Sequence, residues 1–196
     1  MLPPRRAVTP LLLAATFGAA AGLFKGVDPG WRAGVGNLSA PWLLVAFLPA
    51  LRCKTTMRGA LTGLLSTLVA LAAFYAVLTL SLAGRLGGGG YASEYLVEAD
   101  ANRIYFVAGM VTGPLLGAAG AWIGRHHRAA TWMVVGGLLS GEILAVALTT
   151  GHRLAPSPLY FEWGVDDWRP YIAESALGLT IMLAALRQRR PTITDV

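Results

Sequence analysis

Long apolar segments alternate along this chain with short polar connections. A helix needs about 20 residues to cross a hydrocarbon layer about 30 Å thick. Six segments reach or approach that length, and charged and aromatic residues separate them. The pattern predicts an all-α, polytopic membrane protein whose residues 1–196 form a single transmembrane domain, a bundle of six transmembrane helices. The predicted spans are Thr9–Phe24, Gly34–Leu51, Gly59–Ala83, Ile104–Gly124, Ala129–Thr149 and Trp168–Leu186.

The first segment has a second interpretation. It follows Arg5 and Arg6 and ends in the run Ala19–Ala21, which is also the pattern of a cleaved signal peptide. We favour a membrane anchor, because the later segments already form a consistent topology and the small residues continue as a helix-packing pattern.

Composition supports a lipid environment. Hydrophobic residues make up 55% of the chain and charged residues only 13%, against about 25% charged residues in soluble domains. The formal net charge is +6. The basic residues lie in short clusters between apolar segments rather than on one face, so we expect no nucleic-acid partner. The predicted surroundings are the lipid bilayer of the cell (plasma) membrane, crossed several times.

Positive charge is shared unequally between the two sets of helix ends. Ten Lys and Arg residues fall on one set and six on the other, which also carries nearly all the acidic residues. Because cytoplasmic connections are enriched in Lys and Arg, the first set and both termini are predicted to be cytoplasmic. The residues of this set are Arg5, Arg6, Arg52, Lys54, Arg58, Arg125, Arg128, Arg187, Arg189 and Arg190.

The second segment is predicted to be a broken helix. Only Trp42–Leu51 is strongly apolar, which is too short to span, and Pro41 disfavours helical geometry just before it. Asn37 and Ser39 should lie near the break. Irregular backbone at membrane depth is found where it is buried in protein or lines a cavity, and broken helices mark many transporter sites. A short tilted helix with a re-entrant loop and no ligand is the alternative.

Two acidic residues fall inside predicted spans. Glu142 lies in the fifth and Glu174 in the sixth, where a charge costs roughly 2.5–3.5 kcal/mol on insertion scales. At about 1.5 Å per residue, both lie at a depth similar to that of Ser39, in the outer half of the membrane. The predicted ligand-binding residues are therefore Glu142, Glu174, Asn37 and Ser39. The alternatives are a structural hydrogen bond for Glu142 and an outer interfacial position for Glu174.

Catalytic and metal-binding patterns are not found. One cysteine, Cys53, cannot form a cysteine-based metal cage, and the adjacent His126 and His127 do not converge on one ion from a helix. Ser140 has no histidine in another span to act as its base. We therefore expect no enzyme activity, no metal and no cofactor.

Glycines at spacing four predict close helix packing. They are Gly18 and Gly22 in the first span, Gly59 and Gly63 in the third, Gly109, Gly113 and Gly117 in the fourth, and Gly137 and Gly141 in the fifth. These faces either fold the monomer tightly or bind a membrane-protein partner, for which Gly18, Gly22, Gly113 and Gly117 are the candidates.

The predicted outer connections include two long segments. Tyr91–Ala101 carries Glu94 and Glu98 four residues apart, which allows a short surface helix. His152–Pro170 is either a lid or a loop anchored by its aromatic residues. Tyr171, like Trp122 and Trp132, is expected in an interfacial aromatic belt.

The runs NLSAPWLLVAFLPALR, GPLLGAAGAWIGRHHR and LLSGEIL resemble an uncharacterised family of small bacterial six-helix membrane proteins, defined only as a domain of unknown function. This resemblance implies no activity. The layout is also similar, more loosely, to the substrate-binding subunits of energy-coupling-factor transporters, which have an outer-half pocket. In that comparison Ala15, Ala19, Gly18 and Gly22 would correspond to small residues that dock the transport module.

The sequence thus leaves two functions open. One is small-molecule binding or transport through an outer-half pocket. The other is a non-transporting membrane scaffold that binds another membrane protein through glycine-rich helix faces.

Overall fold

The computed structural model describes residues 4–25, 31–36, 38–86, 90–149 and 167–188. All regular structure in these residues is α-helical, and each predicted segment corresponds to a helix within a few residues, except the second, which is divided between two helices. The surface helix expected at Tyr91–Ala101 is confirmed as α5. In chain order the helices are α1 (Pro4–Lys25), α2 (Trp31–Gly36), α3 (Ser39–Ala50), α4 (Thr56–Leu86), α5 (Tyr91–Ala101), α6 (Arg103–His126), α7 (Arg128–Thr149) and α8 (Arg169–Gln188).

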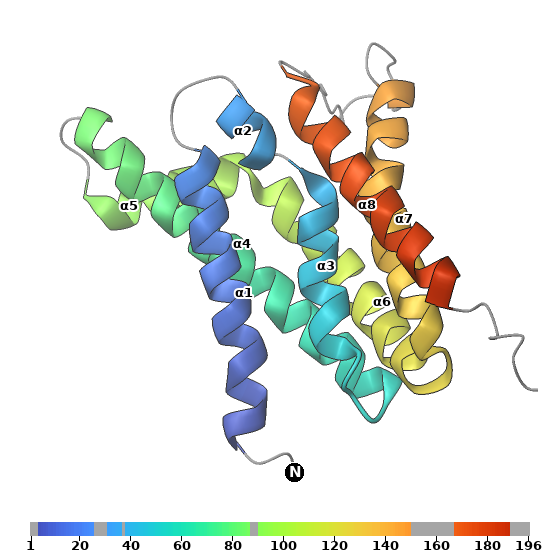
Figure 1. The fold of residues 1–196 in the computed structure, drawn as a ribbon. Coiled ribbons are helices and arrows are strands. Elements are labelled where there is room, and N and C mark those ends of the chain that lie inside the picture. The colour runs from blue at the N-terminus through green and yellow to red at the C-terminus, as the bar shows by residue number, and fades with distance from the viewer. Residues whose placement is uncertain (1–3, 26–30, 37, 87–89, 150–166, 189–196) are drawn as a thin grey trace, which may run out of the picture.

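The long helices run between two ends of one bundle (Figure 1). The start of α1, the turn between α3 and α4, the turn between α6 and α7 and the end of α8 lie towards the lower end. The short helix α2 and the start of α8 lie at the upper end. This arrangement brings predicted cytoplasmic clusters to one end, while the side of the membrane that this end faces stays a prediction.

Within the described residues, four helices are long and apolar enough to cross a membrane. The second predicted span is divided between α2 and α3, and α8 includes Arg169, Glu174 and Arg187. Neither α3 nor α8 is among the four, so a six-span bundle stays a prediction. The four candidate spans are Val8–Lys25, Thr56–Ser81, Arg103–His126 and Ala130–Leu148.

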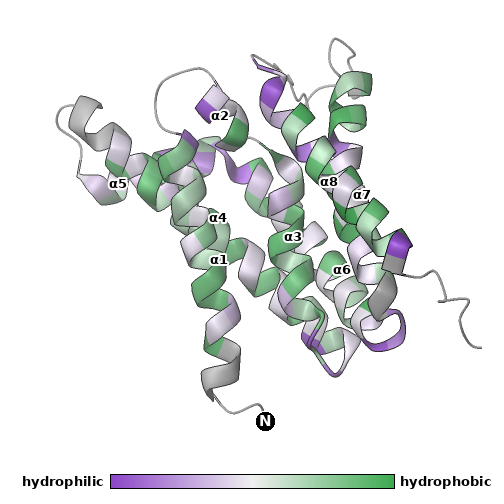
Figure 2. Ribbon diagram, in the orientation of Figure 1, coloured by the Kyte–Doolittle hydropathy of each residue, from purple (hydrophilic) through white to green (hydrophobic). Residues whose placement is uncertain are grey.

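Apolar side chains cover much of the outer surface of these helices. Leu12 is 62% exposed, Leu115 64% and Leu148 64%. Figure 2 shows hydrophilic residues gathered near the turns and helix ends, and hydrophobic residues along the middle of the helices. Leucines exposed along several helices suit hydrocarbon contact better than water, which agrees with a membrane location.

Glycines allow two pairs of helices to touch backbone to backbone. A Cβ atom added at Gly18 would meet the carbonyl oxygen of Ala70 at 2.0 Å, and one at Gly117 would meet that of Gly59 at 2.1 Å. Gly22 and Gly113 are similarly close to α4. The expectation that the glycine face of the fourth span is buried is confirmed. All four candidate partner-binding glycines already contact another helix of the same chain.

Tight packing within the monomer, one of the two expectations for Gly137 and Gly141 of the fifth span, was wrong. Among the described residues, nothing lies within 4 Å of a Cβ atom placed at either glycine. The close contact is made one residue earlier, where a Cβ atom on Gly136 would lie 2.6 Å from the carbonyl oxygen of Gly178. Gly136 and Gly178 therefore join α7 and α8 into a tightly packed hairpin.

Aromatic rings join the other helices. Phe17 of α1, Trp42 of α3 and Phe74 of α4 pack edge to face, with ring centroids 5.1 and 5.3 Å apart. Trp42 thereby links α3 to both α1 and α4, which pack directly on each other. Tyr171, expected in an interfacial belt, is instead buried, with 5% of its surface exposed. It packs against Leu38 and Val146, so its ring belongs to the core.

Candidate functional site

The predicted break in the second span is present at Leu38. Leu38 has the extended backbone angles φ −59° and ψ 126°, and α3 begins at the next residue. Asn37, predicted beside the break, lies outside the described residues. Pro41 is in the first turn of α3, where a missing N–H breaks no helical hydrogen bond. The break thus creates a helix N-terminus inside the protein, and no side chain near it in sequence caps it.

Glu142 of α7 caps this N-terminus. The backbone N–H of Ser39 donates to Oε1 at 2.5 Å, and that of Ala40 donates to Oε2 at 2.6 Å. The first N–H groups of a helix have no partner within it and carry partial positive charge. A carboxylate that accepts from two of them satisfies both donors and places its charge where the helix dipole favours it.

Burial makes this contact important to the fold. Glu142 is 7% exposed and Ala40 is 2% exposed, so water cannot replace the carboxylate oxygens. A buried donor left without an acceptor costs about 1–3 kcal/mol. Glu142 therefore makes the structural hydrogen bond that was weighed for it, and its carboxylate holds a helix end in place, while a role in ligand binding stays a prediction.

Glu174 of α8 lies beside this cap. It is 6% exposed, and neither of its carboxyl oxygens has a hydrogen-bond donor among the described residues. The carboxyl group is close enough to that of Glu142 for the two to interact directly. Two carboxylates offer only acceptors to each other, so a hydrogen bond between them requires a proton on one. Glu174 is therefore buried within the bundle near the start of α8, while its depth in a membrane stays a prediction.

Apolar clusters lie on both sides of the two carboxyl groups. On one side are Ala40, Phe47, Val135 and Leu139. On the other are Leu38, Val146 and Tyr171, described above. The two carboxyl groups thus lie next to the apolar clusters that join α3, α7 and α8.

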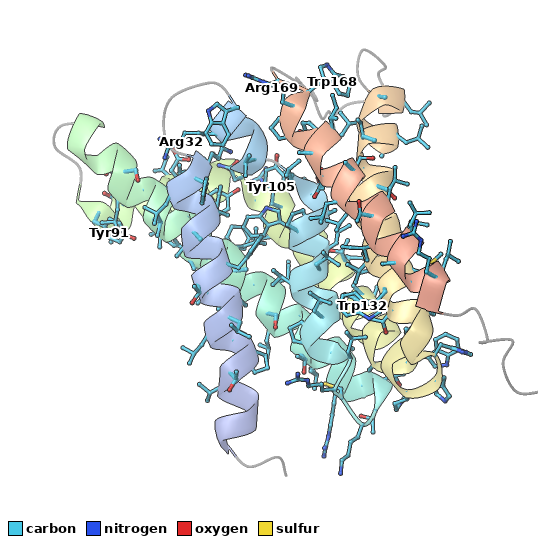
Figure 3. All side chains as sticks on the ribbon, in the orientation of Figure 1. Arg32, Tyr91, Tyr105, Trp132, Trp168 and Arg169 are labelled. Atoms are coloured by element: carbon cyan, nitrogen blue, oxygen red, sulfur yellow. The ribbon has the colours of Figure 1, made fainter. Side chains whose placement is uncertain are left out.

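The start of α8 is anchored close to the upper end of the site. Asp167 accepts from the backbone N–H of Arg169 at 2.9 Å and from its guanidinium group at 2.7 Å. These hydrogen bonds hold the pKa of Asp167 below its usual range. The contact fixes the first turn of the helix that carries Glu174. Figure 3 shows Arg169 and Trp168 at this upper end.

The structure brings together three of the four predicted site residues. Ser39, Glu142 and Glu174 meet, but Ser39 contributes its backbone N–H to the contact. Ala40 was missed. Pro41 could have indicated it, because a proline is tolerated in the first turn of a helix, and the N–H groups that precede it there have no partner within the helix.

Other candidate groups have structural neighbours. The Ser140 hydroxyl donates to the carbonyl oxygen of Gly136 at 2.8 Å, within α7. Among the described residues, no three His, Cys, Asp or Glu side chains gather as metal ligands do.

A family model described as a family of unknown function, DUF6518, matches residues 1–196. No curated protein matches the chain, and no solved structure does. The match agrees with the expected family of unknown function, whereas none of the comparisons shows a likeness to energy-coupling-factor subunits.

Proposed function

The chain belongs to the DUF6518 family of unknown function, and we propose that it is a small-molecule transport protein of the plasma membrane that binds a proton at the Glu142–Glu174 pair. The observation that carries this proposal is a buried Glu174 carboxyl group that meets no hydrogen-bond donor among the described residues and interacts with the buried carboxyl group of Glu142.

A proton is the simplest ligand for this geometry. Two like charges a few ångströms apart in a low-dielectric interior cannot both persist, so one carboxyl group of such a pair holds a proton. The two backbone donors on Glu142 favour its ionised form. Glu174, which meets no donor in the part of the chain that the structure describes, is then the residue that carries the proton and donates a hydrogen bond to Glu142.

The pair also lies across a seam between two parts of the bundle. Helices α7 and α8 contact each other far more extensively than they contact the rest of the chain. The hydrogen bonds from Ser39 and Ala40 to Glu142 join this hairpin to α3. Moving a proton from Glu174 to Glu142 would weaken that junction and let the hairpin shift against α3. Proton exchange thereby becomes coupled to movement, which transport requires.

In broken membrane helices, a half-helix N-terminus commonly faces the anionic group of a substrate. Here the N-terminus of α3 faces Glu142, an anion of the chain itself. If the hairpin shifts, this N-terminus becomes free for an anionic group of a solute. The proposal therefore favours solutes that carry a carboxylate or a comparable anion.

The test combines solute binding with proton measurement. Detergent-purified protein is screened with small carboxylic acids by thermal shift, and each stabilising solute is added to weakly buffered protein containing a pH-indicator dye. We expect a proton change on binding in the parent and none in Glu174→Gln. Glu98→Gln on α5, a partly buried glutamate away from the pair, is the matched control. Equal proton changes in the parent and in Glu174→Gln would contradict the proposal.

A membrane scaffold remains the second candidate, on one specific observation. Gly137 and Gly141 lie four residues apart on α7 and face open space, so another helix can approach there closely. Gly18, Gly22, Gly113 and Gly117 are already packed within the chain, and a partner using them would first have to displace a helix. Crosslinking in membranes from a cysteine replacing Gly137 distinguishes the candidates, because a scaffold gives one defined adduct.

A further inference from the structure

A second feature, separate from the carboxyl pair, lies at the lower end of the bundle. It is a hollow of about 790 Å³ between the α3–α4 turn and the adjoining ends of α6 and α7. The residues that line it are Leu51, Arg52, Cys53, Lys54, Gly124, Arg125, Thr131 and Trp132.

Three cationic side chains meet in this hollow. Arg52, Lys54 and Arg125 all line it, and none of its lining residues is acidic. No ion pair with an acidic residue is formed by these three in the part of the chain that the structure describes. The hollow therefore concentrates positive charge for which the described residues supply no acidic partner.

The charges are held in place by a contact between the two turns. The guanidinium group of Arg125 donates to the backbone carbonyl of Lys54 at 2.5 Å. This hydrogen bond uses one of the five N–H donors of Arg125. Arg52 and Lys54 line the same hollow, and the fork of a guanidinium group suits a phosphate or another oxyanion.

The surroundings are those of a membrane–water boundary. Trp132 is 54% exposed and lies next to Thr131, which is 8% exposed. Figure 3 shows Trp132 in the lower half of the bundle, far from Trp168 and Arg169 at the upper end. Exposed tryptophans are typical of the headgroup level of a bilayer, and basic pockets between membrane helices bind anionic headgroups.

We propose that this basic hollow binds a phosphate group through Arg52, Lys54 and Arg125, and that an anionic phospholipid headgroup supplies it. The shared chemistry is a phosphate oxyanion with no positive charge attached. A free phosphate ion offers the same chemistry without acyl chains, and the experiment separates the two sources.

Cys53 provides a reporter in the unaltered protein. It is the only cysteine of the chain, it lines the hollow, and its thiol lies 3.5 Å from the Thr62 hydroxyl. Detergent-purified full-length protein is treated with a maleimide, and alkylation is followed by intact mass. The reaction is run with no addition, with dihexanoyl phosphatidylglycerol, with dihexanoyl phosphatidylcholine and with inorganic phosphate.

We expect phosphatidylglycerol to slow alkylation of Cys53 severalfold and phosphatidylcholine to have little effect. In the double variant Arg52→Gln, Lys54→Gln, the apparent affinity for phosphatidylglycerol should fall at least about tenfold, because two charge-assisted hydrogen bonds are lost. The ratio of rates with and without lipid is compared within each variant, so any change in the intrinsic reactivity of the thiol cancels.

Arg58→Gln is the matched control. Arg58 is an exposed arginine at the start of α4 and is not among the residues that line the hollow. Its protection by lipid should equal that of the parent. Thermal unfolding of each variant reports whether the fold is retained.

Each outcome decides the proposal. Protection by phosphatidylglycerol alone supports a lipid headgroup, and equal protection by inorganic phosphate supports the phosphate site with a soluble source. Equal protection by phosphatidylcholine, no protection by either anion, or an equal loss in Arg58→Gln would overturn it. If the double variant unfolds, the salt dependence of protection in the parent decides instead: protection that persists unchanged at high salt overturns the proposal.

Discussion

Glu142 and Glu174 are the same residue type on neighbouring helices, and their hydrogen bonding makes them respond differently to the same substitution. Glu142 accepts from two backbone N–H groups, one on each carboxyl oxygen. Glu174 meets no donor among the described residues and lies against the carboxyl group of Glu142. A glutamine has one acceptor oxygen and one NH2 donor, so it fits the second position and not the first.

We therefore predict that Glu142→Gln destabilises the protein by about 1–3 kcal/mol, because its NH2 group opposes a backbone N–H that no longer has an acceptor. Glu174→Gln should retain or raise stability, because its NH2 group donates to Glu142 as a protonated carboxyl group would. Thermal unfolding in detergent measures both. A similar loss of stability in the two variants would contradict the assigned hydrogen bonds.

The sequence alone could identify the two glutamates as unusual, but it could not identify the groups that donate hydrogen bonds to Glu142. Glu142 and Glu174 stand out because a carboxylate in an apolar segment is costly. The donors are backbone groups of Ser39 and Ala40, 103 and 102 residues away from Glu142, and every residue carries such a group. Only the position of the break at Leu38 makes these two available, and this position depends on tertiary packing.

At the scale of helices, the contact between α4 and α6 depends on the absence of side chains. A Cβ atom at Gly117 would lie 2.1 Å from the carbonyl oxygen of Gly59, whereas one at Gly137 meets nothing within 4 Å. Gly117→Ala should therefore cost about 1–3 kcal/mol as the helices separate. Gly137→Ala should gain up to about 1 kcal/mol, since alanine favours a helix more than glycine. Thermal unfolding of both variants in detergent gives the comparison, and equal stability would show that the α4–α6 contact is looser than described.

The positions of the helices along the chain were easier to predict than the faces by which they pack against each other. Apolar length alone located α4, α6 and α7, because the thickness of a membrane sets that length. The packing face of α7 was predicted at Gly137, whereas the residue that packs against α8 is the preceding one, Gly136. Adjacent residues on a helix are about 100° apart, and both belong to one Gly-Gly pair, so only the partner residue Gly178 on α8 determines which one is buried.

For the whole molecule, the connectivity predicts which turns share a side of the membrane. The α3–α4 and α6–α7 turns lie towards the same end of the bundle (Figure 1), and the excess of Lys and Arg there predicts that this end is cytoplasmic. Reporter fusions at Lys54 and Arg128 should read cytoplasmic, and a fusion at Ser93 on α5 should read external. One inverted reading within this set would refute the proposed orientation.

The central claim is that the Glu142–Glu174 pair holds one proton inside the membrane. Infrared difference spectroscopy of the purified protein at neutral pH detects the C=O stretch of a protonated carboxyl group directly, and hydrogen–deuterium exchange identifies it by its shift. The account predicts this band in the parent and in Glu98→Gln, and its loss in Glu174→Gln. The absence of the band in the parent, or its persistence in Glu174→Gln, would contradict the account.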